Sequence, residues 1–493
     1  MKLHDVLAGA TVAEWTADEP VEVTELAYSS AEVRQGTLFF CVPGARANGH
    51  DFAAAAVEAG ASALVVERRL ELGIPQAVVA DARAAMAPAA AAFFEDPTAE
   101  LRVAGITGTN GKTTTAFLLR HLLEVAGVRT GLLGTVKQIV GGAEAEVERT
   151  TPEAIDLQRT FREMLDAGDG ACVIEVSSHA LALGRADRVR FAAATFTNLT
   201  QDHLDFHPDM DEYFQAKARL FSGTPAPPAA AIVNLDDAYG ARLADDLRDR
   251  DCEPVTFSAG GQAADYVAAA VSFDASGSRF TCRGPDGEYA VELGLPGDFN
   301  VANALAALAT AGALGVRGAE AAGALAGAEQ VPGRLEPVDE GQPFAVLVDY
   351  AHTPDSLDNV LRAARRITSG RVICVFGAGG DRDRHKRPLM SAAAAALADL
   401  AVVNSDNPRS EDPEAILAEI QAGMARDGAR AEIRSEVDRR AAIAMALAAA
   451  VSGDTVVIAG KGHEQGQEFE GGRKIPFDDR DVAREGLRGL AAP

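Results

Sequence analysis

The chain has 493 residues, too many for one ordinary hydrophobic core, and this length predicts about three domains. Its hydrophobic content of 47% and charged content of 24% are typical of a globular protein. The formal net charge of −26 argues against a nucleic acid or an anionic membrane surface as a partner. A site for an anionic substrate must therefore be locally basic within an acidic molecule.

The cysteine pattern indicates a reducing compartment, and the hydropathy pattern indicates no membrane-spanning segment. The five cysteines are odd in number and lack the paired spacing of a disulfide framework or a zinc site. The first residues do not resemble a signal peptide, and the sequence offers no segment with the length and apolarity of a membrane-spanning helix. We expect a cytoplasmic protein without a membrane-inserted segment.

Residues 1–98 are typical of a small α/β domain. Apolar runs at 37–42, 63–66 and 76–80 predict strands, and residues 52–59 predict a helix. Asp81 is placed to cap an alanine-rich helix that ends near residue 94.

Residues 99–330 alternate strand and helix patterns, which predicts a mostly parallel sheet. Residues 255–295 alternate apolar and polar positions, so we expect an antiparallel extension, followed by a helix over 300–314. Parallel sheets bind ligands at the carboxyl ends of their strands, and several polar motifs lie there. The expected parallel strands are residues 102–106, 131–133, 171–176, 193–198 and 230–234.

From residue 331 the alternation starts again, with a Val-Pro-Gly hinge followed by four strand patterns. The simplest interpretation is a second nucleotide-binding-like sheet. The predicted architecture is therefore α/β with three domains. These are a small N-terminal domain at 1–98, a central phosphate-loop ATPase-like domain at 99–330 and a Rossmann-like domain at 331–493.

The strongest single signal is Gly108-Thr-Asn-Gly-Lys-Thr113, between an apolar run and an amphipathic run. Strand, glycine loop and helix in this order bring backbone N–H groups and a helix dipole to phosphate oxygens. Lys112 is expected on the outer phosphates and Thr113 on magnesium. The glycine spacing departs from the standard loop, because Ile106 stands where a glycine is expected. The alternative is an ordinary glycine-rich connection, which the Gly-Lys-Thr opening of a helix disfavours.

Two further motifs are candidates for holding a nucleotide-bound magnesium. Glu175 ends a buried strand, where a carboxylate suits the metal, although a strand-end salt bridge would use the same residue. His203 lies in a polar turn with a second histidine and two aspartates, and Lys217 follows on a predicted helix. The spacing is unlike a zinc site, and the turn by itself fits a capped surface loop equally well.

Polar motifs also follow the strands of the last domain. Asp349 could hydrogen-bond a ribose or an adenine edge, or belong to a helix-capping turn. A glycine turn followed by dense basic charge is an anion-binding candidate, with an exposed loop as the alternative for Arg384 and Arg387. Arg409 could bind a carboxylate with two parallel hydrogen bonds, and Glu464 adds a carboxylate. An acid and at least two arginines on neighbouring strand ends suit an amino acid that carries both charges.

Seven motifs in a fixed order make nearly the whole chain resemble the Mur ligases, ATP-dependent amide-forming enzymes that build the stem peptide of peptidoglycan. Within the family, the chain is similar to the branch that adds diaminopimelate as the third residue. The motifs are Gly108-Thr-Asn-Gly-Lys-Thr113, Glu175-Val-Ser-Ser-His179, Asn198-Leu-Thr-Gln-Asp-His203, Asn300-Val-Ala-Asn303, Gly333-Arg-Leu-Glu336, Asp349-Tyr-Ala-His-Thr-Pro354 and Gly460-Lys-Gly-His-Glu464.

The resemblance implies ATP and Mg²⁺ as cofactors. It places ATP at Gly108, Thr109, Asn110, Gly111, Lys112, Thr113, Thr114, Asn300, Asn303, Arg334 and Asp349. It assigns the metal to Thr113, Glu175, His203 and a carbamylated Lys217, and it counts Lys112, Glu175, His203 and Lys217 as catalytic. The UDP-muramoyl dipeptide would bind Tyr28, Ser30, Thr150, Thr151, Ser177 and Arg185, in part through the N-terminal domain. Diaminopimelate would bind Arg382, Asp406, Asn407, Pro408, Arg409, Gly460 and Glu464.

The implied reaction joins diaminopimelate to the D-glutamate γ-carboxylate of UDP-N-acetylmuramoyl-L-alanyl-D-glutamate through an acyl phosphate, in a monomeric enzyme. In the resemblance, the tetrad at 406–409 marks diaminopimelate over lysine, because its arginine can pair with a distal carboxylate that lysine lacks. The open alternatives are the same ligase with lysine or another diamino acid, a folate-modifying relative, and a nucleotide-binding protein without catalysis. Residues 33–60 keep the uridine-domain pattern and disfavour the folate relative, and the retained catalytic residues disfavour the third alternative.

Overall fold

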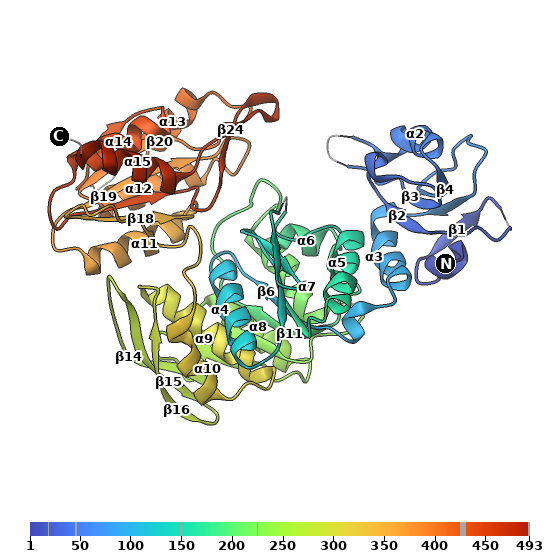
Figure 1. Cartoon of the computed structure of the whole chain (residues 1–493), viewed down its shortest axis with the longest axis horizontal. Coiled ribbons are helices and arrows are strands. Elements are labelled where there is room, and N and C mark those ends of the chain that lie inside the picture. Colours follow the sequence, from blue (N-terminus) through green and yellow to red (C-terminus); the bar gives the residue numbers. More distant parts are fainter. Residues whose placement is uncertain (18, 45–46, 148, 224, 424–429, 492–493) are drawn as a thin grey trace. The chain divides into compact units, whose positions relative to one another are not determined.

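The computed structural model describes residues 1–17, 19–44, 47–147, 149–223, 225–423 and 430–491. Its helices and strands are shown in Figure 1 in colours that follow the sequence. No helix among these residues is long and apolar enough to cross a bilayer. The chain forms two compact units, the first made of Met1–Thr107, Gly127–Thr195 and Ala216–Ala231, and the second of Gly108–Ala126, Phe196–Gln215 and Ile232–Pro493.

The N-terminal domain is a five-stranded sheet within the first unit. Its order is β1 (Val12–Trp15), β5 (Gln76–Val79), β4 (Ala61–Val66), β3 (Thr37–Phe40) and β2 (Glu25–Ala27). Strands β2 to β5 are parallel, and β1 runs antiparallel to β5. The three predicted strands and the helix at α2 (Ala53–Glu58) are confirmed. So is the cap of α3 (Ala82–Phe93), where Asp81 Oδ1 accepts the N–H of Ala84 at 2.9 Å.

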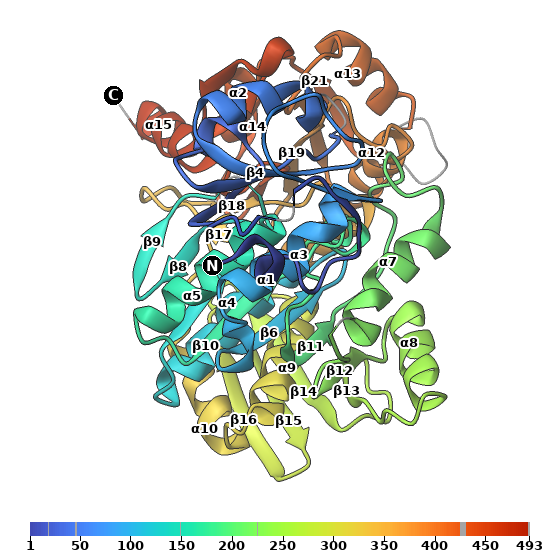
Figure 2. The same ribbon diagram turned by 90° about the vertical axis from the view of Figure 1, so that its right-hand side faces the viewer.

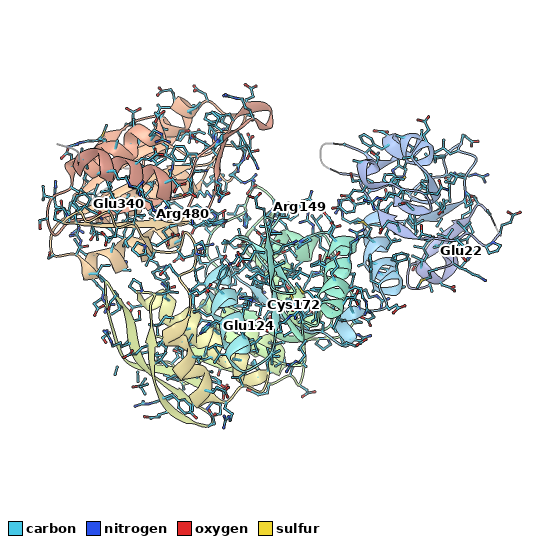
Figure 3. The ribbon with its side chains drawn as sticks, in the orientation of Figure 1. Glu22, Glu124, Arg149, Cys172, Glu340 and Arg480 are labelled. Carbon is cyan, nitrogen blue, oxygen red and sulfur yellow. The ribbon has the colours of Figure 1, made fainter. Side chains whose placement is uncertain are left out.

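The first unit also holds six strands of the central domain. In spatial order they are β11 (Phe191–Phe196), β6 (Arg102–Thr107), β10 (Ala171–Glu175), β7 (Thr130–Leu133), β8 (Gln138–Val140) and β9 (Ala143–Ala145). Strand β10 is parallel to β6 and β7, and it is buried along its whole length, with Cys172 in its interior (Figure 3). Continuous apolar runs are typical of such doubly covered parallel strands.

The second unit holds the rest of the central domain. Helix α4 (Lys112–Val125) packs along α9 (Asp298–Ala313). Strands β12 (Ala231–Asn234) and β13 (Val255–Ser258) are parallel. Strands β14 (Tyr266–Asp274), β15 (Gly277–Gly284) and β16 (Gly287–Leu293) pair antiparallel, as predicted, and lie side by side in Figure 2. The predicted antiparallel range of 255–295 is wrong for β13, which pairs parallel with both β12 and β14.

The C-terminal domain is a six-stranded sheet in the second unit. Its order is β17 (Glu336–Pro337), β18 (Ala345–Asp349), β22 (Thr455–Ala459), β19 (Val372–Ala378), β20 (Leu400–Ser405) and β21 (Glu432–Ser435). All strands except β17 are parallel. The predicted fold class is confirmed: three α/β domains, with a mostly parallel central sheet and a Rossmann-like last domain. The domain boundaries stay a prediction.

Successive side chains along β19 point to opposite faces of this sheet and pack into two separate hydrophobic cores. Cys374 and Phe376 pack with α11 (Pro354–Ile367), α12 (Lys386–Leu397) and α13 (Pro413–Gln421). Ile373 and Val375 pack with α14 (Arg439–Ala449) and α15 (Asp479–Ala491) on the other face. Because both faces are covered, the carboxyl ends of the parallel strands are the edge where ligands can bind.

Candidate active site

The glycine loop between β6 and α4 has no room for side chains at two positions. Gly108 (φ +150°) and Gly111 (φ +86°) adopt backbone conformations that favour glycine. A Cβ atom on Gly108 would lie 1.9 Å from Thr197 Oγ1, and one on Gly111 would lie 2.3 Å from Asn303 Oδ1. Close contacts therefore explain why glycines stand at these positions.

Lys112 opens α4 and folds over the loop. Its Nζ donates to the carbonyl oxygens of Gly108 and Thr109, each at 2.9 Å. Thr113 and Thr114 follow it, buried in the first turn. The first N–H groups of a helix have no partner within the helix. Together with the lysine ammonium they make a small basic site that suits phosphate oxygens.

The segment after β11 holds the loop in place. Asn198 accepts the N–H of Asn110 at 2.9 Å and donates its own amide to the Asn110 carbonyl at 3.2 Å. Thr109 Oγ1 donates to the Thr200 carbonyl and lies 3.1 Å from the hydroxyl of Tyr213. Tyr213 is fully buried, and its role was not predicted, because only its tertiary contact reveals it.

The start of α9 brings the two predicted asparagines to the same loop. Asn303 lies against Gly111 and donates to Asn300 Oδ1 at 3.2 Å. Asn300 in turn donates to the Pro296 carbonyl at 2.9 Å. Both side chains are buried, so their orientations are fixed by the helix start.

Arg334 and Asp349, which the family resemblance assigns to ATP, lie together in the second unit. Arg334 Nη2 donates to Thr113 Oγ1 at 3.0 Å, and its guanidinium lies 4.8 Å from the ring centre of Tyr350. Asp349 accepts the N–H of Leu335 at 2.7 Å. Burial raises the pKa of Asp349, and the charge of Arg334 opposes part of that shift.

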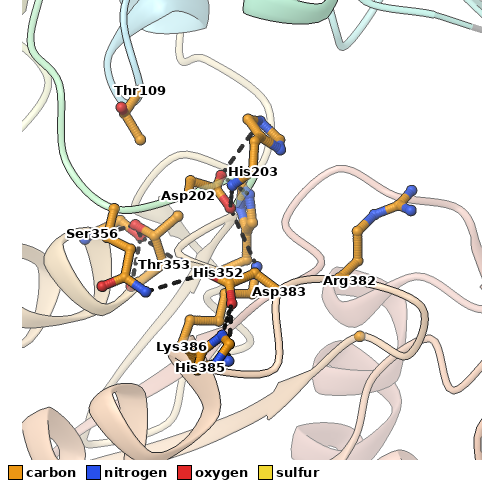
Figure 4. A network of polar contacts seen from close by, with 12 residues as sticks. Thr109, Asp202, His203, His352, Thr353, Ser356, Arg382, Asp383, His385 and Lys386 are labelled. Atoms are coloured by element: carbon orange, nitrogen blue, oxygen red, sulfur yellow. Dashed lines mark hydrogen bonds and ion pairs between the residues drawn. The ribbon is translucent and has the colours of Figure 1, made fainter. Parts of the chain in front are cut away.

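A polar network surrounds Asp202, as Figure 4 shows. One Asp202 oxygen lies 3.5 Å from His203 Nε2 and 3.7 Å from His352 Nε2, and the other lies 3.6 Å from Lys386 Nζ. Burial alone would raise the pKa of Asp202, but these contacts outweigh it and hold the pKa well below its usual range. His352 and Lys386 were not among the predicted site residues, because they come from distant strand ends.

The predicted amino-acid site combines the loops after β20 and β22. Lys461 is fully buried, and its Nζ donates to Asn407 Oδ1 at 2.9 Å and to Glu464 Oε2 at 2.6 Å. A Cβ on Gly460 (φ +119°) would lie 2.6 Å from Asp406 Oδ2. Burial opposes ionisation of Asp406, but Lys461 and other nearby cations lower its pKa. Lys461 was not predicted, since only the fold places it between the two motifs.

Two arginines meet at the glycine turn after β19. A Cβ on Gly379 would lie 3.0 Å from Arg409 Nη1 and 3.9 Å from Arg382 Cγ. Arg409 donates through Nε to Glu468 Oε2 at 2.9 Å and through Nη1 to a carbonyl of the turn at 2.7 Å. In the same turn, a Cβ on Gly380 would lie 1.9 Å from the carbonyl oxygen of Pro408. The structure thus brings Arg382 and Arg409 to one turn, with Glu468 beside Arg409, and their role toward an amino acid stays a prediction.

The first unit groups other predicted residues around Thr151. Its Oγ1 donates to the Glu175 carbonyl at 2.8 Å and accepts the N–H of Ser177 at 3.1 Å. Glu175 is fully buried and its carboxylate accepts the N–H and hydroxyl of Thr135 at 2.8 and 3.1 Å. The Thr135 hydroxyl also lies 3.1 Å from that of Thr150.

Three arginines converge on the buried carboxylate of Glu153. Arg83 lies 2.8 Å away, Arg185 3.0 Å and Arg149, which is labelled in Figure 3, 3.9 Å. Arg185 also donates to the Thr151 carbonyl at 3.3 Å. Only Arg185 was predicted. This cluster is a locally basic region within an acidic protein.

The remaining predicted residues of the first unit are Tyr28, Ser30 and Lys217. The hydroxyl of Tyr28 donates to Asp156 at 2.7 Å, and burial raises its pKa. Ser30 begins the short helix η1 (Ser30–Glu32). Lys217 is almost completely buried on α7 (Met210–Ser222). Within the described ranges, no three His, Cys, Asp or Glu side chains cluster as a metal site.

Comparison with known proteins gives the same class. Residues 22–106 match the Mur ligase family catalytic domain, 106–311 the Mur ligase middle domain and 333–462 the Mur ligase glutamate ligase domain. The fold and the site thus define an ATP-dependent ligase. The chain belongs to the Mur ligase family.

Two similar curated proteins and one similar solved structure carry the same enzyme name. A UDP-N-acetylmuramoyl-L-alanyl-D-glutamate–2,6-diaminopimelate ligase of Streptomyces coelicolor is 48% identical over 96% of this chain and 94% of its own length. The ligase of the same name from Geobacillus kaustophilus is 45% identical over 95% of both chains. A solved structure with that enzyme name matches over 100% of both chains at 32% identity, with a TM-score of 0.69.

Proposed function

We infer that this chain is the ATP-dependent ligase that adds diaminopimelate to UDP-N-acetylmuramoyl-L-alanyl-D-glutamate during synthesis of the peptidoglycan precursor. The observation that carries this inference is the full-length similarity to ligases of that name. The assembled loops after β19, β20 and β22 support it, because they combine two arginines with the carboxylates of Asp406 and Glu464.

The reaction has two steps. An oxygen of the D-glutamyl γ-carboxylate attacks the γ-phosphorus of ATP, ADP leaves, and an acyl phosphate forms. An amine of diaminopimelate then attacks the acyl carbon, the amide bond forms, and phosphate and a proton leave. In our proposal the loop at 108–114, Asn300, Asn303, Arg334 and Asp349 bind ATP. Catalysis then consists mainly of positioning and of stabilising negative charge.

We propose Mg²⁺ as the metal, held by Thr113, Glu175, His203 and a carbamylated Lys217. The hydroxyl of Thr113 at the start of α4 and the buried carboxylate of Glu175 are oxygen donors of the kind that Mg²⁺ prefers. Carbamylation would replace the ammonium of Lys217 by a carboxylate. Bound Mg²⁺ would neutralise charge on the phosphates.

The two organic substrates are assigned to separate groups of residues. Tyr28, Ser30, Thr150, Thr151, Ser177 and Arg185 bind the UDP-muramoyl dipeptide in this proposal, supported by the arginines around Glu153. Arg382, the tetrad at 406–409, Gly460 and Glu464 bind diaminopimelate. Arg409 selects it over lysine through the distal carboxylate. We propose that the enzyme acts as a cytoplasmic monomer.

The test is phosphate release with ATP, Mg²⁺ and the UDP-muramoyl dipeptide, compared among diaminopimelate, lysine and ornithine. We expect release that needs both the dipeptide and diaminopimelate. The Arg409→Ala variant should have a greatly raised KM for diaminopimelate, with residual turnover, while its affinity for ADP stays unchanged. Equal rates with lysine would contradict the amino-acid assignment, and no release with any amine would favour a non-catalytic nucleotide-binding protein.

A further inference from the structure

The short strand β23 (Gly466–Glu468) hydrogen-bonds along the loop that carries the tetrad at 406–409. The side chain of Gln467 donates to the Asp406 carbonyl at 2.6 Å. The N–H of Glu468 donates to Asn407 Oδ1 at 2.9 Å, and its carbonyl accepts the N–H of Arg409 at 3.1 Å. Both the backbone and the side chain of Glu468 therefore contact the tetrad.

The conformation of Arg409 depends on these contacts. Its φ of +51° lies in the left-handed region, which is unfavourable for residues other than glycine and persists where the surroundings enforce it. Its side chain is only 19% exposed and is held by the carboxylate of Glu468 and by the carbonyl of Gly380. These two bonds fix the plane of the guanidinium and leave other N–H groups for a ligand.

We propose that Glu468 is a positioning residue that sets the specificity of the amino-acid site by orienting Arg409. This inference rests on the proposed function. With Glu468 in place, the outer N–H groups of Arg409 are directed at the distal carboxylate before the substrate arrives. Without it, the long side chain must be ordered during binding, and that loss of rotamer freedom reduces affinity. The two parallel hydrogen bonds of a carboxylate–guanidinium pair also need a strict geometry, so a misoriented guanidinium of Arg409 would bind the substrate carboxylate more weakly.

A competing effect of Glu468 has the opposite sign. Its negative charge, 2.9 Å from Arg409 Nε, repels a substrate carboxylate that approaches the same guanidinium. If neutralisation of Arg409 were its main effect, removing the charge would tighten binding of diaminopimelate. If Glu468 mainly positions Arg409, removing it should weaken the binding of diaminopimelate. The direction of the change in KM for diaminopimelate therefore distinguishes positioning from charge repulsion.

The test compares the Glu468→Ala and Glu468→Gln variants with Glu470→Ala. Glu470 is an exposed glutamate two residues further on, so its removal makes the same change in net charge. We expect Glu468→Ala to raise the KM for diaminopimelate on the order of tenfold to a hundredfold, the range for lost charge-assisted hydrogen bonds. The KM for ATP should stay unchanged, and the preference for diaminopimelate over lysine should fall.

Glu468→Gln keeps an oxygen that accepts from Arg409 Nε, so it should recover a large part of the affinity. If Glu468→Ala lowers the melting temperature of the full chain, the comparison of Glu468→Gln with the unmutated enzyme still tests the proposal. Glu470→Ala should behave as the unmutated enzyme. Failure of the glutamine variant to recover affinity would show that the hydrogen bond is not what orients Arg409.

A double-mutant cycle checks that Glu468 acts through Arg409. In the Arg409→Ala background, Glu468→Ala should raise the KM for diaminopimelate no further, because the group it orients is gone. Independent, multiplicative losses would overturn the proposal, as would an unchanged or lower KM in Glu468→Ala alone. If the unmutated enzyme releases no phosphate with diaminopimelate, the proposed function fails as well, so the two failures can be told apart.

Discussion

Arg387 shows how one buried charge organises a loop near the candidate site. Its side chain is fully buried, and its two terminal nitrogens contact Glu411 at 2.8 and 2.9 Å and Glu419 at 2.7 Å. The sequence left an exposed charged loop open for both Arg384 and Arg387. That alternative is wrong for Arg387, while Arg384 is exposed and pairs with Glu419. Nothing in the spacing of the basic residues distinguishes the buried arginine from the exposed one.

This network predicts a stability effect that depends on pH. The hydrogen bond from Arg387 lowers the pKa of Glu411, and Arg384 and Arg387 lower that of Glu419. Carboxylates with lowered pKa values stabilise the fold above the ordinary glutamate value of 4.5, and this contribution is lost as the pH falls through their folded-state pKa. Arg387→Met should lower the free energy of unfolding by about 3 kcal/mol at pH 7, because it leaves two acids without their buried partner.

The measurement is urea unfolding of the full chain followed by circular dichroism at several pH values. The loss of unfolding free energy in Arg387→Met should shrink below about pH 4.5, because Glu411 and Glu419 become increasingly protonated there. Arg384→Met, at an exposed pair, should cost less than about 1 kcal/mol. A deficit that is the same at every pH would contradict the role of Glu411 and Glu419.

At the scale of elements, the sequence revealed both the strands buried on two faces and the alternating strands β14 to β16. Strands β10, β19 and β20 are buried at every residue and read as continuous apolar runs. The hairpin strand β9 was not predicted, because all three of its residues are exposed and no hydrophobic pattern marks it. The same limit applies to the site. Glycine loops and strand-end motifs are local in sequence, whereas Glu468 acquires its role only through a tertiary contact.

Helix α4 allows a controlled test of the glycine loop, because left-handed glycines lie at both of its ends. Gly111 (φ +86°) precedes the helix, where a Cβ would collide with Asn303, and Gly127 (φ +80°) follows it, with nothing within 4 Å of such an atom. Gly111→Ala should weaken ADP binding at least about tenfold, since the loop must shift to relieve the collision. Gly127→Ala should cost about 1 kcal/mol of stability from backbone strain and leave ADP affinity unchanged.

Isothermal titration of the two variants with ADP and Mg²⁺ separates strain from collision. Both substitutions add the same methyl group at nearly the same backbone angle, so a common effect of strain would appear in both. Equal losses of ADP affinity would argue that the loop is not the nucleotide site.

At the scale of the whole molecule, the cysteines are built-in reporters of the two units. Cys41 lies in the first unit and Cys282 and Cys374 in the second, all three buried. Burial raises the pKa of each of these thiols to about 12. Thiolate, not thiol, attacks labelling reagents, so these cysteines should react only when the surrounding structure opens. Cys252, which is partly exposed, should react fastest and serves as the internal reference.

Bound nucleotide should slow the labelling of the buried cysteines by different amounts in the two units. The loop at 108–114, Asn300, Asn303, Arg334 and Asp349 all belong to the second unit. A ligand that binds only the folded form stabilises it by about 2.7 kcal/mol at about a hundred times its Kd, which slows opening-dependent labelling about a hundredfold. Saturating ADP without Mg²⁺, which would also engage Glu175 and Lys217 of the first unit, should therefore protect Cys282 and Cys374 much more than Cys41, as followed by mass spectrometry of labelled peptides. Equal protection of Cys41 would show that the two units open as one, and no protection of Cys282 or Cys374 would contradict a nucleotide site in the second unit.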